Sequence, residues 1–248
     1  MSKIVNRTLD VFEAFAERRE PLLLTDLMKV LDIPLSSCHD MVRALEQRGY
    51  LYEVRHRSGY YPTARLLDVA RAIVDHDPVS VRAAPVLERL AQDLQASASL
   101  AKAKGLQLTY LAVNLPPDPL RFTVSVGSAV RNLHATSAGK AFLGSLPVAE
   151  RERVVAGLAL EPLTPATLTS TESLLADVRA GEARGWFVNR EESVEDALTL
   201  SARFAWNGSV YVVTVAGTLK RMERQYEHAA AAVVAAARAL GSQDDDAG

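Results

Sequence analysis

The order of the strand-like segments is the feature of this sequence that most limits how it can fold. Five such segments lie at 98–104, 107–114, 121–126, 197–205 and 209–216. The dipeptide Asn207-Gly208 separates the last two and is typical of a tight hairpin turn. Because the strands follow one another directly, with helical patterns before and after them, the sequence predicts an antiparallel sheet of α+β type rather than alternating βαβ units.

Helical periodicity accounts for most of the other residues beyond residue 78. Apolar residues recur at spacings of three and four at 79–95, 135–146, 148–158, 171–184 and 219–240. The acidic segment Asp244 to Gly248 follows, and its composition is typical of disorder. We therefore expect one folded region at 79–241 and a disordered tail at 242–248.

The first 50 residues predict three short helices. The first, at 4–18, has an apolar face formed by Val5, Leu9, Phe12 and Phe15. The second begins with Thr25 as its expected N-cap and has an inner face of Leu27, Met28 and Leu31. The third has Ser36 or Ser37 as its expected N-cap, ends at Gly49 and has an inner face of Cys38, Met41 or Val42, and Leu45.

A hairpin with a basic tip follows the third helix. The apolar runs Leu51 to Val54 and Tyr60-Tyr61 flank the segment Arg55-His56-Arg57-Ser58-Gly59. Two helices joined by a short turn and followed by such a hairpin predict a winged helix-turn-helix at 1–62. Helical spacing resumes at 63–76, and Asp77-Pro78 interrupts it, so we expect a linker helix over 63–78.

Charge and cysteine content narrow the possible functions. Residues 1–75 hold 11 basic and 11 acidic residues, so the chain lacks the overall positive charge of a histone-like protein and any DNA contact must be local. The single cysteine, Cys38, permits no internal disulfide, which suits a reducing compartment. No apolar run is long enough to span a membrane and the first residues do not resemble a signal peptide, so we expect a cytoplasmic protein with no membrane partner.

Three segments of the chain resemble the IclR family of bacterial transcription regulators. They are the predicted winged helix-turn-helix at 20–62, the stretch Leu133-His134-Ala135-Thr136-Ser137-Ala138-Gly139-Lys140-Ala141, and the run from Arg184-Gly185-Trp186 to Glu192. The resemblance covers nearly the whole chain. It implies an N-terminal winged helix-turn-helix, a linker helix and a C-terminal effector-binding domain with a GAF-like antiparallel sheet and flanking helices.

The third helix and the hairpin supply the candidate DNA-binding residues. Side chains near the N-terminus of a recognition helix reach base edges in the major groove, and here those are Ser36, Ser37, His39 and Arg43. Arg55 and Arg57 flank the hairpin tip, from which a wing touches the backbone or the minor groove. The alternative is that these residues form an ordinary solvated face on a module that binds proteins.

The stretch from His134 to Lys140 is the candidate anion site. It opens a helix, and the free amides of a helix N-terminus bind anions without any charged side chain. The resemblance implies that the amides of Ser137 and Ala138 hold an effector carboxylate and that four further residues line the cavity: Asn189, Thr199, Thr214 and Ala216. The alternative is that the small residues allow close helix-to-sheet packing and that the threonines favour strand structure.

Enzyme motifs are weak in this sequence. The Ser-x-x-Lys pattern of some acyl-transferring enzymes occurs twice, at Ser99 to Lys102 and at Ser137 to Lys140, but the motifs that accompany it are absent. No nucleotide-binding glycine loop or metal-ligand spacing of histidines occurs, so we expect no cofactor and no metal.

These observations favour a ligand-responsive transcriptional regulator. We expect a homodimer or homotetramer that binds a pseudo-palindromic DNA operator and a small organic acid as effector. Two alternatives stay open at this stage: a small-molecule-processing enzyme with an accessory winged helix, and a metabolite-sensing module that recruits a protein.

Overall fold

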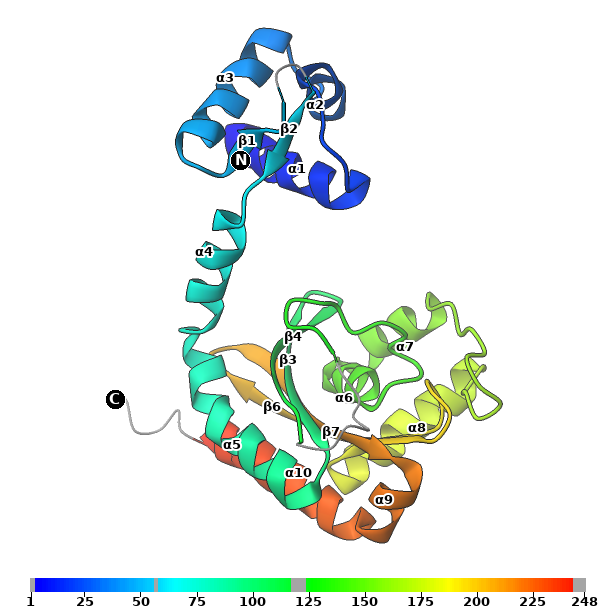
Figure 1. Cartoon of the computed structure of the whole chain (residues 1–248). Helices are drawn as coiled ribbons and strands as arrows, with labels where there is room; N and C mark the ends of the chain where they lie inside the picture. The colour runs from blue at the N-terminus through cyan, green and yellow to red at the C-terminus, as the bar shows by residue number, and fades with distance from the viewer. Residues whose placement is uncertain (1–2, 56–57, 117–123, 243–248) are drawn as a thin grey trace. The chain divides into compact units, whose positions relative to one another are not determined.

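The computed structural model describes residues 3–55, 58–116 and 124–242. The chain divides into two compact units, Met1–Asp75 and His76–Gly248 (Figure 1). In the part of the chain that the structure describes, no helix has the length and apolar character that crossing a membrane requires. The predicted tail falls almost wholly on residues 243–248, outside the described residues.

The N-terminal unit has the elements of a winged helix-turn-helix. In chain order they are α1 (Lys3–Arg18), α2 (Leu24–Leu31), α3 (Leu35–Gln47), β1 (Leu51–Glu53), β2 (Tyr60–Pro62) and α4 (Arg65–Val74). β1 and β2 form an antiparallel hairpin, as the sequence predicts. Cys38, Val42 and Leu45, on the predicted inner face of α3, are buried in one cluster with Leu27 and Phe15. Gly49 follows α3 with a φ of 76°, the left-handed conformation expected of a residue just beyond a helix.

The predicted inner face of the first helix is partly wrong. Val5 and Leu9 are exposed, whereas Phe15 is buried together with Val11 and Ala14. The reason is that the core of this unit contacts only the C-terminal half of α1. The apolar side chains Val5 and Leu9 in its first two turns therefore have no core residues of this unit to pack against. The sequence pattern identified an apolar stripe but could not show how far along the helix the core extends.

The predicted N-caps of the second and third helices are also wrong. Leu23 and Pro34 precede α2 and α3, and Thr25, Ser36 and Ser37 lie inside the first turns. At α2 the carboxylate of Asp26 accepts a hydrogen bond of 3.1 Å from the amide of Leu23. At α3, Pro34 has a φ of −58°, close to the value its ring imposes and compatible with entry into a helix. Neither helix therefore depends on a hydroxyl N-cap.

The C-terminal unit is built on a five-stranded antiparallel sheet with the order β4-β3-β7-β6-β5. Its strands are β3 (Ser97–Lys104), β4 (Gln107–Asn114), β5 (Phe187–Arg190), β6 (Ala197–Trp206) and β7 (Ser209–Thr218). The turn at Asn207-Gly208 has positive φ at both residues, as the hairpin motif predicts. The α+β class with an antiparallel sheet is confirmed.

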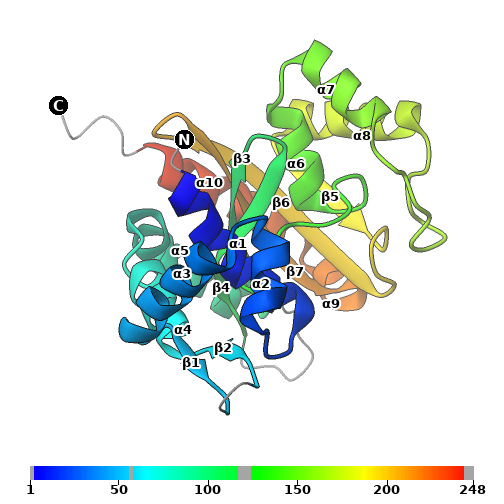
Figure 2. The same ribbon diagram turned by 90° about the horizontal axis from the view of Figure 1, so that it is seen from above.

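Helices cover both faces of this sheet (Figure 2). One face packs against α5 (Pro78–Leu94), α9 (Leu219–Arg224) and α10 (Tyr226–Gly241). The other packs against α6 (Ser137–Ser145), α7 (Val148–Ala156) and α8 (Thr171–Arg184). Side chains of β7 alternate between the two cores, so Val213 and Val215 face α5 and α10 while Thr214 faces the side of α6.

Two predicted elements differ from the structure in this unit, and one observed strand was not predicted. The strand at 121–126 is absent from its described residues, 124–126, because the outer edge of β4 pairs instead with Ser128 and Val130. β5 was not predicted, since four residues are too few to show a period. The last helix is divided into α9 and α10 at Gln225, whose φ of −126° is not helical.

Candidate functional site

The exposed face of α3 holds the residues predicted to read DNA. Ser36, His39 and Arg43 follow one another at helical spacings and are exposed, whereas Cys38 and Val42, on another face of the helix, are buried. The N-cap of α3 provides no side-chain hydrogen bond, and the first backbone amide of the helix that has a partner among the described residues is that of Cys38. The amides at the start of α3 are therefore available to a phosphate, as at other helix N-termini.

The other DNA-binding predictions fall on less regular positions. Ser37 is exposed and lies at the edge of a groove between α1 and α3. Arg55 is exposed in the hairpin turn, where its carbonyl accepts a 2.8 Å hydrogen bond from the amide of Ser58. Arg57 lies outside the described residues. Nδ1 of His39 is 3.8 Å from the carboxylate of Asp40, so a negative charge stands within the basic face.

The start of α6 forms one wall of a cavity of about 240 Å³ in the C-terminal unit. Thr136 is the N-cap, and its side chain accepts a 3.1 Å hydrogen bond from the amide of Gly139. The structure gives the amides of Ser137 and Ala138 no partner among the described residues. Because the N-cap already satisfies the third amide, the first two are the ones left for an anion.

A chain of hydroxyl groups lies beneath this helix terminus. Oγ of Ser137 shares hydrogen bonds of 2.6 Å with Thr199 and 2.8 Å with Ser201, and Ser201 shares one of 2.8 Å with Thr214. Strand register explains the grouping, because Ser201 pairs with Thr214 and Thr199 pairs with Ala216 across β6 and β7. These contacts fix the side of the helix that faces the sheet.

All six residues predicted to bind the effector line this one cavity: Ser137, Ala138, Asn189, Thr199, Thr214 and Ala216. Sequence reasoning missed several others, among them Ser97, Ser99, Tyr110, Thr136, Ser193 and Val194. The alternation of Ser97 and Ser99 with the buried Ala98 and Leu100 was the signal that could have placed the two serines on one face. None of the lining residues that the structure describes is charged.

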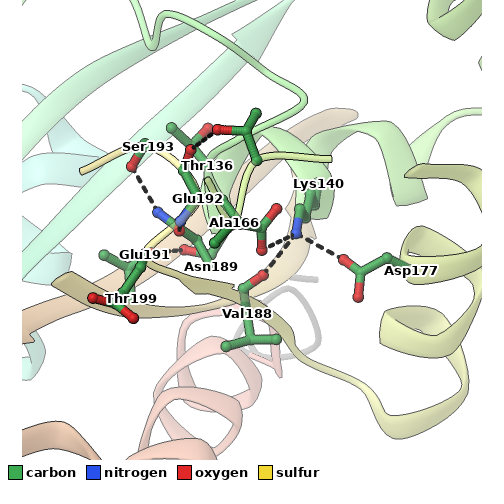
Figure 3. A network of polar contacts seen from close by, with 12 residues as sticks. Thr136, Lys140, Ala166, Asp177, Val188, Asn189, Glu191, Glu192, Ser193 and Thr199 are labelled. Atoms are coloured by element: carbon green, nitrogen blue, oxygen red, sulfur yellow. Dashed lines mark hydrogen bonds and ion pairs between the residues drawn. The ribbon is translucent and has the colours of Figure 1, made fainter. Parts of the chain in front are cut away.

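Lys140, in the same helix, has its ammonium buried beside the cavity rather than in it (Figure 3). Nζ lies 2.6 Å from a carboxylate oxygen of Glu192 and 2.8 Å from one of Asp177, and it donates to the carbonyl of Val188. The hydroxyl of Ser137 is engaged by Thr199 and Ser201. The Ser137 to Lys140 pattern therefore does not form the serine–lysine pair of an acyl-transferring enzyme.

Two family models match the chain and together span most of it. The model of the IclR helix-turn-helix domain matches residues 5–55, which include α3 and β1 and end at Arg55 in the hairpin turn. The model of the bacterial transcriptional regulator IclR C-terminal domain matches residues 71–242, which include every residue of the cavity.

Individual transcriptional regulators are also similar to this chain in sequence and in fold. SauR, a probable transcriptional regulator of Cupriavidus necator, is 26% identical over 204 residues, which are 82% of this chain and 80% of that protein. The solved structure of a transcriptional regulator from a Rhodococcus species has a TM-score of 0.78 at 21% identity and covers 97% of both chains. An IclR homologue from Microbacterium hydrocarbonoxydans, solved with 4-hydroxybenzoate, has a TM-score of 0.70 at 20% identity and covers 95% of this chain and 99% of its own.

Proposed function

This chain belongs to the IclR family of bacterial transcriptional regulators, and from that premise we propose that a small organic acid bound at the start of α6 controls its binding to an operator. The chain is a transcriptional regulator, not an enzyme, with a helix-turn-helix DNA-binding domain and an IclR C-terminal effector domain. The proposal divides it into a DNA-binding domain at 1–62, a linker helix at 63–78 and an effector domain at 79–241.

The observation that carries this proposal is the pair of free amides at Ser137 and Ala138 within a cavity lined by uncharged residues. The positive end of a helix favours an anion there, and one carboxylate can accept both amide hydrogen bonds. No charged residue of the described lining competes for that carboxylate or would pair with a second charge on the ligand. The site therefore suits a monoanion with one acid group.

The rest of the cavity sets the size and polarity of the ligand. A cavity of about 240 Å³ accommodates a small molecule, and the hydroxyl and amide groups of Thr199, Thr214 and Asn189 offer neutral hydrogen bonds. Tyr110 and Val113 add apolar and aromatic surface. The Microbacterium homologue with bound 4-hydroxybenzoate supports a hydroxylated aromatic acid as the first compound to test.

The proposed DNA interface consists of the exposed face of α3 and the hairpin. We propose that two copies bind a pseudo-palindromic operator with half-sites separated by about 34 to 36 Å or a multiple of that distance. The linker helix supports an oligomer, because α4 has no buried residue and exposes Leu66, Leu67 and Ile73. An apolar helix of this kind is stabilised by a partner, which in this proposal is a second copy.

The test combines DNA binding with two variants at Ser137, which is the first residue of α6. The upstream DNA of the gene is titrated with the protein, and a panel of monocarboxylic acids beginning with 4-hydroxybenzoate is screened for a change in affinity. Ser137→Pro removes one amide donor at a helix position where proline is tolerated. Ser137→Ala removes only the hydroxyl and is the matched control.

We expect an acid that alters wild-type DNA binding to act about tenfold less strongly on Ser137→Pro than on Ser137→Ala, since a hydrogen bond to a charged group contributes about 1.5 kcal/mol or more. Equal responses in the two variants would place the carboxylate elsewhere. A cationic effector would contradict the anion site altogether.

A further inference from the structure

Glu192 connects the two walls of the cavity. It lies in the segment between β5 and β6, of which Ser193 and Val194 line the cavity. Its backbone amide donates a 2.7 Å hydrogen bond to Oδ1 of Asn189, whose side-chain amide in turn donates to Ser193. Its carboxylate lies 2.6 Å from the ammonium of Lys140 in α6 (Figure 3). One residue therefore contacts both the segment at 189–194 and the helix that begins at the anion site.

The backbone of Glu192 is anchored on its other side as well. The carbonyl of Glu192 accepts a 2.6 Å hydrogen bond from Oγ1 of Thr167, and the carbonyl of Glu191 accepts one of 2.6 Å from Thr164. Only the carboxylate of Glu192 reaches toward α6 from this segment in the described contacts. If that contact is lost, the segment keeps its attachment to the 164–167 loop, and α6 is still joined to β5 by the hydrogen bond from Lys140 to the carbonyl of Val188.

Two carboxylates contact the buried ammonium of Lys140, so Glu192 is one of two groups that can neutralise its charge. Burial raises the pKa of Glu192, although the adjacent ammonium of Lys140 acts in the opposite direction. Lys140 is also paired with Asp177 of α8 at 2.8 Å, so its charge is neutralised without Glu192. A second buried carboxylate is therefore not needed to compensate the lysine.

We propose that Glu192 is a positioning residue of the effector site: by holding Lys140, it fixes residues 191–194 of this segment, and through its backbone amide the side chain of Asn189, against the helix terminus that binds the anion. The identity of the ligand in this statement rests on the proposed function. The fixing of the segment does not, because it concerns the protein alone. Asp177 serves as the internal comparison, since it contacts the same ammonium from α8 and, among the described residues, makes no hydrogen bond or ion pair with the segment.

Amide hydrogen exchange of the full-length protein without ligand tests the positioning directly. Glu192→Ala and Asp177→Ala each remove one carboxylate from Lys140 and leave it with the other. We expect peptides covering 189–196 to exchange at least fivefold faster in Glu192→Ala and within twofold of wild type in Asp177→Ala. Glu192→Gln retains an oxygen that can accept from Nζ and should restore part of the protection.

A purely charge-neutralising role for Glu192 gives the opposite pattern, in which the two alanine variants behave alike and glutamine gives no rescue. That result, or unchanged exchange of 189–196 in Glu192→Ala, would overturn the proposal. Circular dichroism and thermal unfolding of each variant show whether the fold persists, and if Glu192→Ala does not fold, the comparison of Glu192→Gln with Asp177→Asn decides in the same way.

Ligand binding forms a second, separate measurement, with 4-hydroxybenzoate as the first probe and the other acids of the panel after it. We expect the affinity for a bound acid to fall about tenfold in Glu192→Ala, about threefold in Glu192→Gln and less than twofold in Asp177→Ala. If none of the acids binds wild type, the proposed effector is wrong while the exchange experiment still decides the role of Glu192. If an acid binds all variants equally, Glu192 does not position the site.

Discussion

The two units of this protein hold their candidate functional residues in opposite ways. In the N-terminal unit these residues lie on the surface and come from one continuous stretch between Ser36 and Arg55, so a single helix and its hairpin carry them. In the C-terminal unit they are largely buried and come from β3, α6, β5, β6 and β7, which lie far apart in sequence. Substitutions in the DNA-binding face should therefore affect binding alone, whereas those around the cavity should affect binding and folding together.

The largest effect is expected at Gly139, which lies in α6 of the C-terminal unit. A Cβ on Gly139 would lie 2.3 Å from the carbonyl oxygen of Leu133, and backbone atoms cannot yield cheaply. We expect Gly139→Ala to destabilise the C-terminal unit by about 3 kcal/mol or more, measured by chemical denaturation. Gly157→Ala is the matched control, since its nearest contact would be an ordinary 3.6 Å, and it should change stability little.

A smaller effect, confined to DNA binding, is expected at Arg43. The side chain is exposed on α3, so Arg43→Ala should weaken binding to the operator by about 1 to 3 kcal/mol and relax its sequence preference, with no change in the unfolding midpoint. Arg55→Ala should instead weaken binding to all sequences alike and reduce the salt dependence. Fluorescence anisotropy at several salt concentrations distinguishes these two effects on DNA binding. A loss of stability in either variant would contradict the expectation that substitutions in the DNA-binding face affect binding alone.

Within the cavity, Thr199 offers a test of modest size. Its hydroxyl shares a hydrogen bond of 2.6 Å with Ser137, which keeps a second partner in Ser201. Thr199→Val should reduce affinity for an effector acid by about 0.5 to 1.5 kcal/mol, measured by calorimetry, because the hydroxyl chain beside the anion is shortened. DNA binding without the acid should not change, and a reduction there would show that the cavity also maintains the DNA-binding form.

The smallest expected effect is a pH dependence of stability that belongs to the C-terminal unit. Burial raises the pKa of Glu192, so the folded state favours its protonated form, and the resulting stabilisation is present at low pH and lost as pH rises through the folded pKa. Glu192→Gln resembles the protonated form. The unfolding temperature of Glu192→Gln, relative to that of wild type, should therefore increase as the pH rises from about 4 to 7. Glu195→Gln, at an exposed position, should track wild type throughout, and parallel curves for all three proteins would contradict the burial argument.

Local sequence signals predicted the N-terminal unit well where packing agreed with them and failed at its edges. The buried face of α3, the hairpin and the end of the helix at Gly49 follow from periodicity and turn chemistry. The N-caps were misplaced because Asp26 and Pro34 start the two helices by other means than a hydroxyl cap. The exposure of Val5 and Leu9 depends on where the neighbouring helices end, which periodicity does not encode.

The sequence by itself determined the class of the fold, the order of the two units and the start of α6 as a helix terminus rich in small residues. These are consequences of local patterns, since period, turn residues and capping act over a few positions. The resemblance carried by Leu133 to Ala141 pointed to the six residues that line the cavity, but not to what surrounds them.

Only the tertiary structure decided how the cavity is assembled. Strand register placed Ser201 beside Thr214, and the return of the chain through β5 brought Glu192 to Lys140, 52 residues away in sequence. Such contacts arise from packing and from the need to pair buried charges, which depend on the whole fold rather than on neighbouring residues. For that reason the sequence presents Lys140 as half of a catalytic pattern, whereas in the structure it is the centre of an ion cluster in the helix that begins at Ser137.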